Sequence, residues 1–104
     1  MKIIESHKFK IRLRVITNYI KKDKQSASVN FIKNLKKTIK NLENSPFKYK
    51  QSDYFDNENI RDMTYMGYTV IYKIYLDENT IVVVDIFNQN KPLDTTKASL
   101  SLKT

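Results

Sequence analysis

The hydrophobic period of this chain changes at Asn44-Ser45-Pro46. Before this point, apolar residues recur every three or four positions, as they do on one face of an α-helix. From residue 60 onward they follow the alternation of a β-strand. Proline disfavours the helical conformation of the residue before it, so Pro46 separates the two parts. The chain is therefore expected to form an α+β domain, in which the helices precede the main strands of the sheet.

The first helix is expected at residues 8–22, with Ser6 as its N-cap. At 100° per residue its apolar positions fall within about 60° of one another. These positions are Phe9, Leu13, Ile16 and Ile20. Residues 9–15 also alternate as a strand would, but the helical stripe spans 12 positions, which is too long for a typical strand.

The second helix is expected to begin after a cap at Ser26 or Ser28 and to end at the Asn44-Ser45-Pro46 break. Its apolar face consists of Phe31, Ile32, Leu35, Ile39 and Leu42. Its opposite face carries Lys33, Lys36, Lys37 and Lys40. Only residues 23–25 connect the two helices, so we expect an antiparallel helical hairpin.

Strands are expected at residues 1–4, 60–65, 68–76 and 80–87, and the last of them ends before Pro92. Met66-Gly67 and Asp77-Glu78-Asn79 are turn sequences, so the last three strands form an antiparallel meander. Residues 47–59 are expected to be a loop with at most a short strand. The predicted order is β-α-α-β-β-β, with the helical hairpin on a three- or four-stranded, mainly antiparallel sheet. The strands are so apolar that both sheet faces are expected to be buried, one by the helices and one by a partner. The domain is expected to span residues 1–94, followed by a flexible polar tail at 95–104.

Composition excludes several kinds of chemistry. The chain has no Cys, one His and one Gly, so a thiol nucleophile, an HExxH zinc site and a glycine-rich phosphate loop are all ruled out. No metal or other cofactor is expected. The longest apolar run, residues 81–84, is far shorter than the roughly 18 residues of a membrane span. We expect a cytoplasmic protein that has no contact with membranes.

The charge of +8 is divided unevenly between the two parts. Residues 1–50 contain 14 Lys and Arg against 3 Asp and Glu, whereas residues 51–104 contain 5 against 8. The basic part predicts an anionic partner, either an acidic protein or a nucleic acid. The simpler alternative is a solubilising surface.

Two segments carry a family resemblance. FIKNLKKTIKNLENSPF (Phe31–Phe47) resembles the second helix of RelE/ParE-type toxins, and Ile60–Pro92 resembles their sheet, including its turn glycine and the Tyr68–Tyr72 strand. The resemblance spans about residues 1–92. It implies the toxin of a type II toxin–antitoxin pair, neutralised by a cognate protein antitoxin in a hetero-oligomer, with a homodimer as the alternative. Members of this superfamily either cut messenger RNA on the ribosome or inhibit DNA gyrase.

The lack of an obvious acid and base set resembles the gyrase-inhibiting branch, and an inactive or divergent toxin that still binds its antitoxin would look the same. A metal-independent endoribonuclease of RelE type needs charge stabilisation and proton transfer. At the positions where the resemblance implies basic residues, this chain has Thr69 and the run Asn88-Gln89-Asn90-Lys91. Asn and Gln carry no charge and transfer no proton at neutral pH. The catalytic set therefore looks incomplete, with Arg61, Lys73 and Lys91 as weak candidates.

Binding residues are assigned from the same comparison. The target is expected to contact Arg61, Tyr65, Lys73, Asn88, Gln89, Asn90 and Lys91. An acidic antitoxin is expected to contact Lys33, Lys36, Lys37 and Lys40. The alternative function is a small basic nucleic-acid-binding module without enzymatic activity.

Several of these residues also have a structural interpretation. Tyr65, Tyr68 and Tyr75 are read first as core and sheet surface, and only second as a platform for stacked bases. His7 is read as a surface or cap residue. Asp62 and Asp85 are expected to pair across strands with Arg61 or Lys73.

Overall fold

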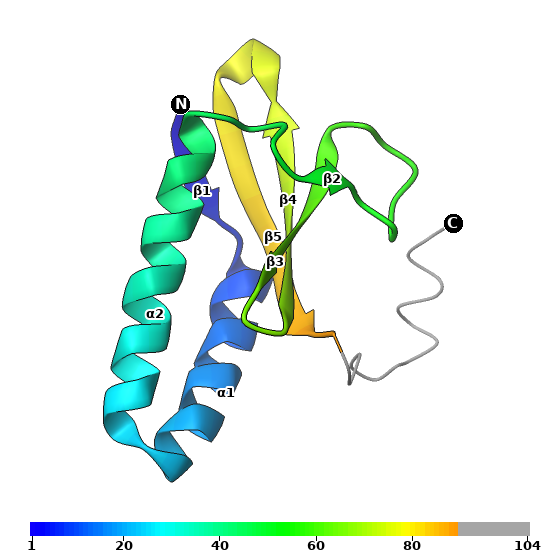
Figure 1. Cartoon of the computed structure of the whole chain (residues 1–104). Helices are drawn as coiled ribbons and strands as arrows, with labels where there is room; N and C mark the ends of the chain where they lie inside the picture. The colour runs from blue at the N-terminus through cyan, green and yellow to red at the C-terminus, as the bar shows by residue number, and fades with distance from the viewer. Residues whose placement is uncertain (90–104) are drawn as a thin grey trace.

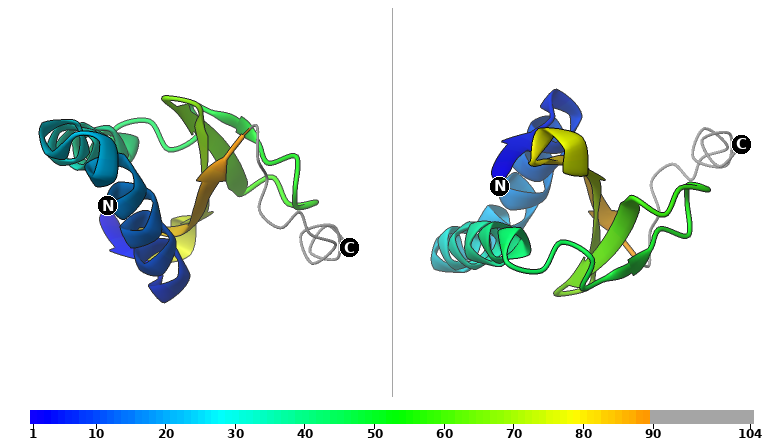
Figure 2. Two further views of the ribbon diagram at one scale, coloured as in Figure 1. Left: turned by 90° about the horizontal axis from the view of Figure 1, so that it is seen from below. Right: turned by 90° about the horizontal axis from the view of Figure 1, so that it is seen from above.

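A computed structural model describes residues 1–89 of the chain. It has two layers, with both helices on one face of a single five-stranded sheet (Figures 1 and 2). The sequence predicted this α+β arrangement and its element order. Asn90, Lys91, Pro92 and the expected tail at 95–104 lie outside the described residues.

The sheet has the strand order β1-β5-β4-β3-β2. Its strands are β1 (Lys2–Glu5), β2 (Lys50–Gln51), β3 (Ile60–Tyr65), β4 (Tyr68–Tyr75) and β5 (Thr80–Asn88). All neighbours are antiparallel except β1 and β5, which run parallel. The sheet has more strands than expected, because the two-residue β2 extends it beyond β3.

Helix α1 (His7–Asp23) begins where the sequence predicted, because Ser6 caps it. The Ser6 Oγ accepts a hydrogen bond from the Phe9 N–H at 3.0 Å and donates one to the Val84 carbonyl at 2.8 Å. Val84 is the extra residue of a β-bulge in β5, because Ile71 pairs with Asp85 and Tyr72 with Val83. The bulge thereby fixes the start of α1 to the sheet.

Helix α2 (Gln25–Lys40) continues into a 3₁₀ turn, η1 (Asn41–Glu43). The prediction of Ser26 or Ser28 as its N-cap was wrong. The cap is Lys24, which makes no side-chain capping bond, and the buried Ser28 hydroxyl instead donates to the Thr17 carbonyl of α1 at 3.2 Å. Only Lys24 connects the two helices, so Ser28 in the second turn of α2 lies near enough to α1 to bond with it.

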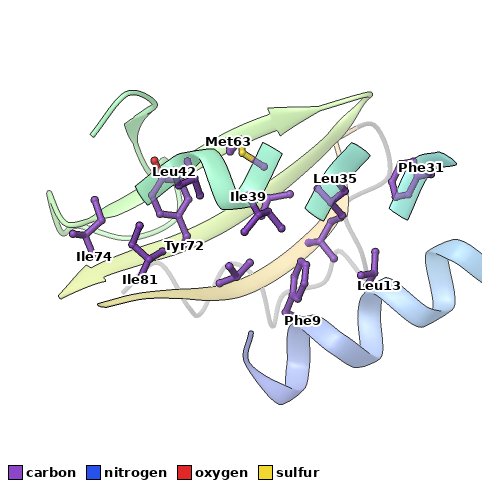
Figure 3. Close-up of a cluster of buried hydrophobic side chains, with 13 residues drawn as sticks. Phe9, Leu13, Phe31, Leu35, Ile39, Leu42, Met63, Tyr72, Ile74 and Ile81 are labelled. Carbon is purple, nitrogen blue, oxygen red and sulfur yellow. The ribbon is translucent and has the colours of Figure 1, made fainter. Parts of the chain in front are cut away.

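The core lies between the helices and the sheet (Figure 3). Phe9 and Leu13 enter it from α1, and Phe31, Leu35 and Ile39 enter it from α2. The sheet contributes Met63, Val70, Tyr72, Ile74, Ile81, Val83 and Ile86. This matches the predicted apolar faces except at Ile32, which is only half-buried and does not belong to the core cluster.

Two turns use left-handed backbone conformations. Met66 and Gly67 have φ of 46° and 85°, as a two-residue hairpin loop requires. The second turn is η2 (Leu76–Glu78), and it closes on Asn79 at φ 49°. Asparagine tolerates this region better than most side chains. Both turns lie at the positions predicted from the sequence.

The second sheet face, here called the open face, points away from the helices (Figure 2). Residues 51–59, here called the 51–59 loop, lie over part of it. The Tyr54 ring in this loop contacts Phe87 of β5 edge-on, with 5.1 Å between ring centroids. Thr69 near the start of β4 and Ile71 in its middle are buried there. We expected a partner to cover this face, but the chain's own 51–59 loop covers part of it. In residues 1–89, no helix combines the length and apolarity needed to cross a membrane.

Candidate functional site

Arg61 and Lys73, two of the target-binding candidates, lie on opposite faces of the sheet. Arg61 pairs with Tyr72, whose side chain is in the core, whereas Lys73 pairs with Ile60. Residues directly opposite each other on neighbouring antiparallel strands point to the same side. Lys73 is therefore on the open face, where its ammonium lies 4.9 Å from the centre of the Tyr75 ring. The structure does not bring Arg61 and Lys73 into one site.

Arg61 holds the chain segment that leads to and from β2. Its guanidinium donates to the carbonyl of Tyr49 at 3.0 Å and to that of Glu58 at 2.9 Å. It also lies over the Phe47 ring, 4.9 Å from the ring centre. These contacts occupy much of the fork that would bind a phosphate. In this structure Arg61 positions a loop.

Tyr65 and Tyr68 pack against helix α2. Their rings meet Phe31 edge-on, with centroids 5.2 and 5.4 Å apart, and the Tyr65 hydroxyl donates to the Phe31 carbonyl at 3.0 Å. Burial raises the pKa of Tyr65 above its usual value. Both rings therefore have a structural role, in packing α2 against the sheet.

The end of β5 lies beside the Met66-Gly67 turn. Asn88 pairs with Tyr68, and the Gln89 N–H donates to the Gly67 carbonyl at 3.0 Å. Asn88 therefore shares the helix-facing side of the sheet with Tyr68, whereas Phe87 next to it contacts Tyr54 on the open face. Asn90 and Lys91, the other two residues of this predicted target-binding run, are outside the described residues.

Asp62 and Asp85 do not form the cross-strand pairs that we expected. Asp85 instead lies beside α1, where its carboxylate is 3.4 Å from Lys8 and 3.7 Å from Arg12. The bulge in β5 explains this, because it shifts the register exactly where Asp85 lies. Asp62 accepts a hydrogen bond from the Asp53 N–H at 2.9 Å. Its other oxygen, Oδ1, is buried without a hydrogen-bond partner among residues 1–89.

A pocket of about 330 Å³ lies in the 51–59 loop. Its lining comprises Gln51, Ser52, Asp53, Tyr54, Phe55 and Asp56. Sequence reasoning treated this segment only as a loop. The signal that could have found it is the density of carboxylates and aromatic rings in residues 53–58. Across residues 1–89, no group of three His, Cys, Asp or Glu side chains is arranged to hold a metal ion.

The α2 lysines predicted to bind an antitoxin all lie at the surface. Lys36 pairs with Glu5 of β1 at 2.7 Å, and Lys40 pairs with Glu43 at 3.2 Å. Within residues 1–89, Lys33 and Lys37 form no ion pair. Lys33 and Lys37 are therefore the members of this set best placed to meet a partner's carboxylates.

Helix α1 exposes an apolar stripe that sequence reasoning missed. Ile11, Val15 and Tyr19 are spaced one helical turn apart and are 45%, 62% and 70% exposed. The strand-like alternation of residues 9–15 was the signal, because it placed apolar residues on the outer side of the helix as well as the inner side. Contiguous exposed apolar patches often mark interaction sites, so this stripe is a candidate binding surface.

Comparison with known proteins identifies the family of this fold. A family model described as "ParE toxin of type II toxin-antitoxin system, parDE" matches residues 3–92. A solved structure titled "Chromosomal ParDE TA system from P. aeruginosa" is similar in fold, with a TM-score of 0.68 and 12% sequence identity over 85% of this chain and 95% of that one. None of the curated proteins matches the sequence. The family model covers most of the chain, so this protein belongs to the ParE toxin family of type II toxin–antitoxin systems.

Proposed function

We propose that this protein is a growth-inhibiting toxin that acts on DNA gyrase and is neutralised by a cognate acidic antitoxin. The family match over residues 3–92 carries the proposal. Both candidate targets of the wider superfamily, gyrase and translating ribosomes, are in the cytoplasm, and so we place the action of this toxin there.

The helical layer is proposed as the antitoxin-binding surface. Helix α1 combines its exposed apolar stripe with six basic residues, and α2 adds Lys33 and Lys37. An acidic amphipathic segment would bury its apolar side on the stripe and place carboxylates beside the cations. A second copy of this chain would instead bring like charges together, which favours a toxin–antitoxin hetero-oligomer over a homodimer.

Gyrase is favoured over messenger RNA because the described residues lack a set for proton transfer. On the open face, Lys73 is the cation of β4, and the carboxylate beneath the 51–59 loop, Asp62, is buried. Arg61 is on the other face and is engaged with backbone carbonyls. Cleavage of RNA needs a base, an acid and charge stabilisation around one phosphate. Residues 1–89 do not assemble them.

Two measurements test the proposal. Inducible expression in a bacterium should stop growth, and co-expression of the neighbouring open reading frame should restore it. Purified protein should then inhibit supercoiling by gyrase. Normal growth without the neighbouring product would refute an active toxin, while growth arrest with unaffected gyrase and cleaved ribosome-bound mRNA would reassign the target.

A matched pair of variants tests the antitoxin surface. Val15→Asp puts a charge in the exposed stripe and should weaken antitoxin binding at least tenfold without loss of folding, since Val15 is at the surface. Leu76→Asp changes an equally exposed apolar residue in η2 and serves as the control. Equal antitoxin affinity in the two variants would contradict the assignment of the stripe.

A further inference from the structure

The 51–59 loop is acidic in a protein that is otherwise strongly basic. Residues 50–62 carry four carboxylates, Asp53, Asp56, Glu58 and Asp62, and two cations, Lys50 and Arg61. Both cations are engaged within the segment: Lys50 pairs with Asp53, and Arg61 bonds to backbone carbonyls. The surface that remains is negative, and it lies beside the open face rather than on the basic helical layer (Figure 1).

A buried carboxylate supports this acidic surface from below. Asp62 is only 3% exposed, and its Oδ2 accepts the N–H of Asp53, which lines the pocket. The Asp62 charge also acts on Tyr54, a second lining residue: burial raises the pKa of Tyr54, and the carboxylates of Asp62 and Asp53 raise it further. The remaining oxygen, Oδ1, has no donor among the described residues. Asp62 is not among the residues that line the pocket, so its carboxylate adds negative potential from behind the lining and makes no direct contact with a ligand.

The lining of the pocket defines the chemistry of such a ligand. Asp53 and Asp56 are exposed carboxylates, and Tyr54 and Phe55 are half-buried aromatic rings within the same six residues. Carboxylates bind a guanidinium through paired hydrogen bonds, and aromatic rings stack on its planar face. Asp53 already makes one contact with a cation at the surface, where the Lys50 ammonium donates to its carboxylate and the bond raises the pKa of Lys50.

We propose that the pocket of residues 51–56, with Asp62 beneath it, receives an arginine side chain of a partner protein. The acidic antitoxin is a poor candidate for this partner, since its complement is the basic helical layer. The site instead disfavours the phosphates of RNA and fits a basic patch on a protein target. This last step rests on the proposed function, whereas arginine binding itself does not.

A peptide titration tests the site directly. The probe is acetyl-Gly-Gly-Arg-Gly-Gly-amide, and the comparison peptide has Gln in place of Arg. NMR of the full chain should show amide shifts concentrated in residues 51–56 and at Asp62 with the Arg peptide only. Asp53→Asn combined with Asp56→Asn should weaken binding at least about threefold, because two exposed carboxylates are lost. The control removes two carboxylates from η2, through Asp77→Asn and Glu78→Gln, and should leave binding unchanged.

Other outcomes would overturn the proposal. Equal shifts with the Gln peptide, or equal binding by both double variants, would remove arginine recognition from this pocket. Shifts of the same residues by Mg²⁺ alone, or by a short single-stranded RNA, would assign it to another ligand class. Growth arrest and gyrase inhibition are scored separately in the wild-type protein, so a failure of the peptide experiment is not confused with failure of the proposed toxin activity.

Discussion

Replacing Tyr72 by Phe should lower the stability of the protein at neutral pH and change how that stability responds to alkali. The Tyr72 ring is fully buried in the core, and its hydroxyl donates to the Pro46 carbonyl at 2.6 Å. That bond attaches the chain after η1 to the central strand β4. Phe fills the same space but leaves the carbonyl without its donor, which should cost about 1–2 kcal/mol of unfolding free energy at pH 7.

The alkaline response follows from the same hydroxyl. Burial raises the pKa of Tyr72 from 10.0 to about 12. Between these two values the unfolded chain loses the proton and the folded chain keeps it. The unfolded state is therefore favoured as the pH rises. The stability supplied by Tyr72 is complete below pH 10 and should fall by about 1.4 kcal/mol by pH 11.

Urea unfolding followed by circular dichroism at pH 7, 9, 10 and 11 measures both effects. The difference in stability between wild type and Tyr72→Phe should be constant up to pH 9 and then shrink to nearly zero at pH 11. Tyr19→Phe is the control, because Tyr19 is 70% exposed on α1. Parallel stability curves for wild type and Tyr72→Phe across this range would refute the reasoning.

Three other changes test the contacts described above. Asp85→Asn should lower the free energy of unfolding by about 1–2 kcal/mol, because Asp85 pairs with two partly exposed cations of α1. An unchanged midpoint of urea unfolding would show that the bulge alone fixes this helix. Arg61→Ala should lower the free energy of unfolding by about 2 kcal/mol and speed amide hydrogen exchange in residues 47–59. Unchanged slow exchange in these residues would show that the Arg61 hydrogen bonds do not hold the segment in place. Lys33→Glu combined with Lys37→Glu should lower the rate constant of antitoxin association about tenfold, and this difference should disappear at high salt. A change only in the rate constant of dissociation would contradict electrostatic steering.

The sequence predicted the helices and the meander because each carries a local signal. Ser6 and the Met66-Gly67 turn act over a few residues, so their positions follow from the chain itself. The cap of α2 was mispredicted because Ser28 has a partner in another helix, at the Thr17 carbonyl. Periodicity cannot show a hydrogen bond between elements.

The candidate site was harder to predict for the same reason. Which face Arg61 occupies depends on the register between β3 and β4, and a shift of one residue reverses it. The partners of Asp85 depend on a bulge that no sequence pattern marked. The 51–59 loop is held in place by two contacts from β3, since Asp62 accepts the Asp53 N–H and Arg61 donates to the Glu58 carbonyl. These placements are set by tertiary contacts.

The pairing of β1 with β5 also determines the order in which the chain can assemble. β1 is synthesised first, yet its hydrogen-bonded neighbour in the sheet begins at Thr80, the residue that pairs with Lys2. The three strands β3, β4 and β5 need only short loops to meet, so they can form early, whereas closing the β1–β5 pair costs about 4 kcal/mol of chain entropy. Ser6 and the first turn of α1 depend on that closure. A newly synthesised chain therefore cannot complete β1 or the cap of α1 until β5 has been made.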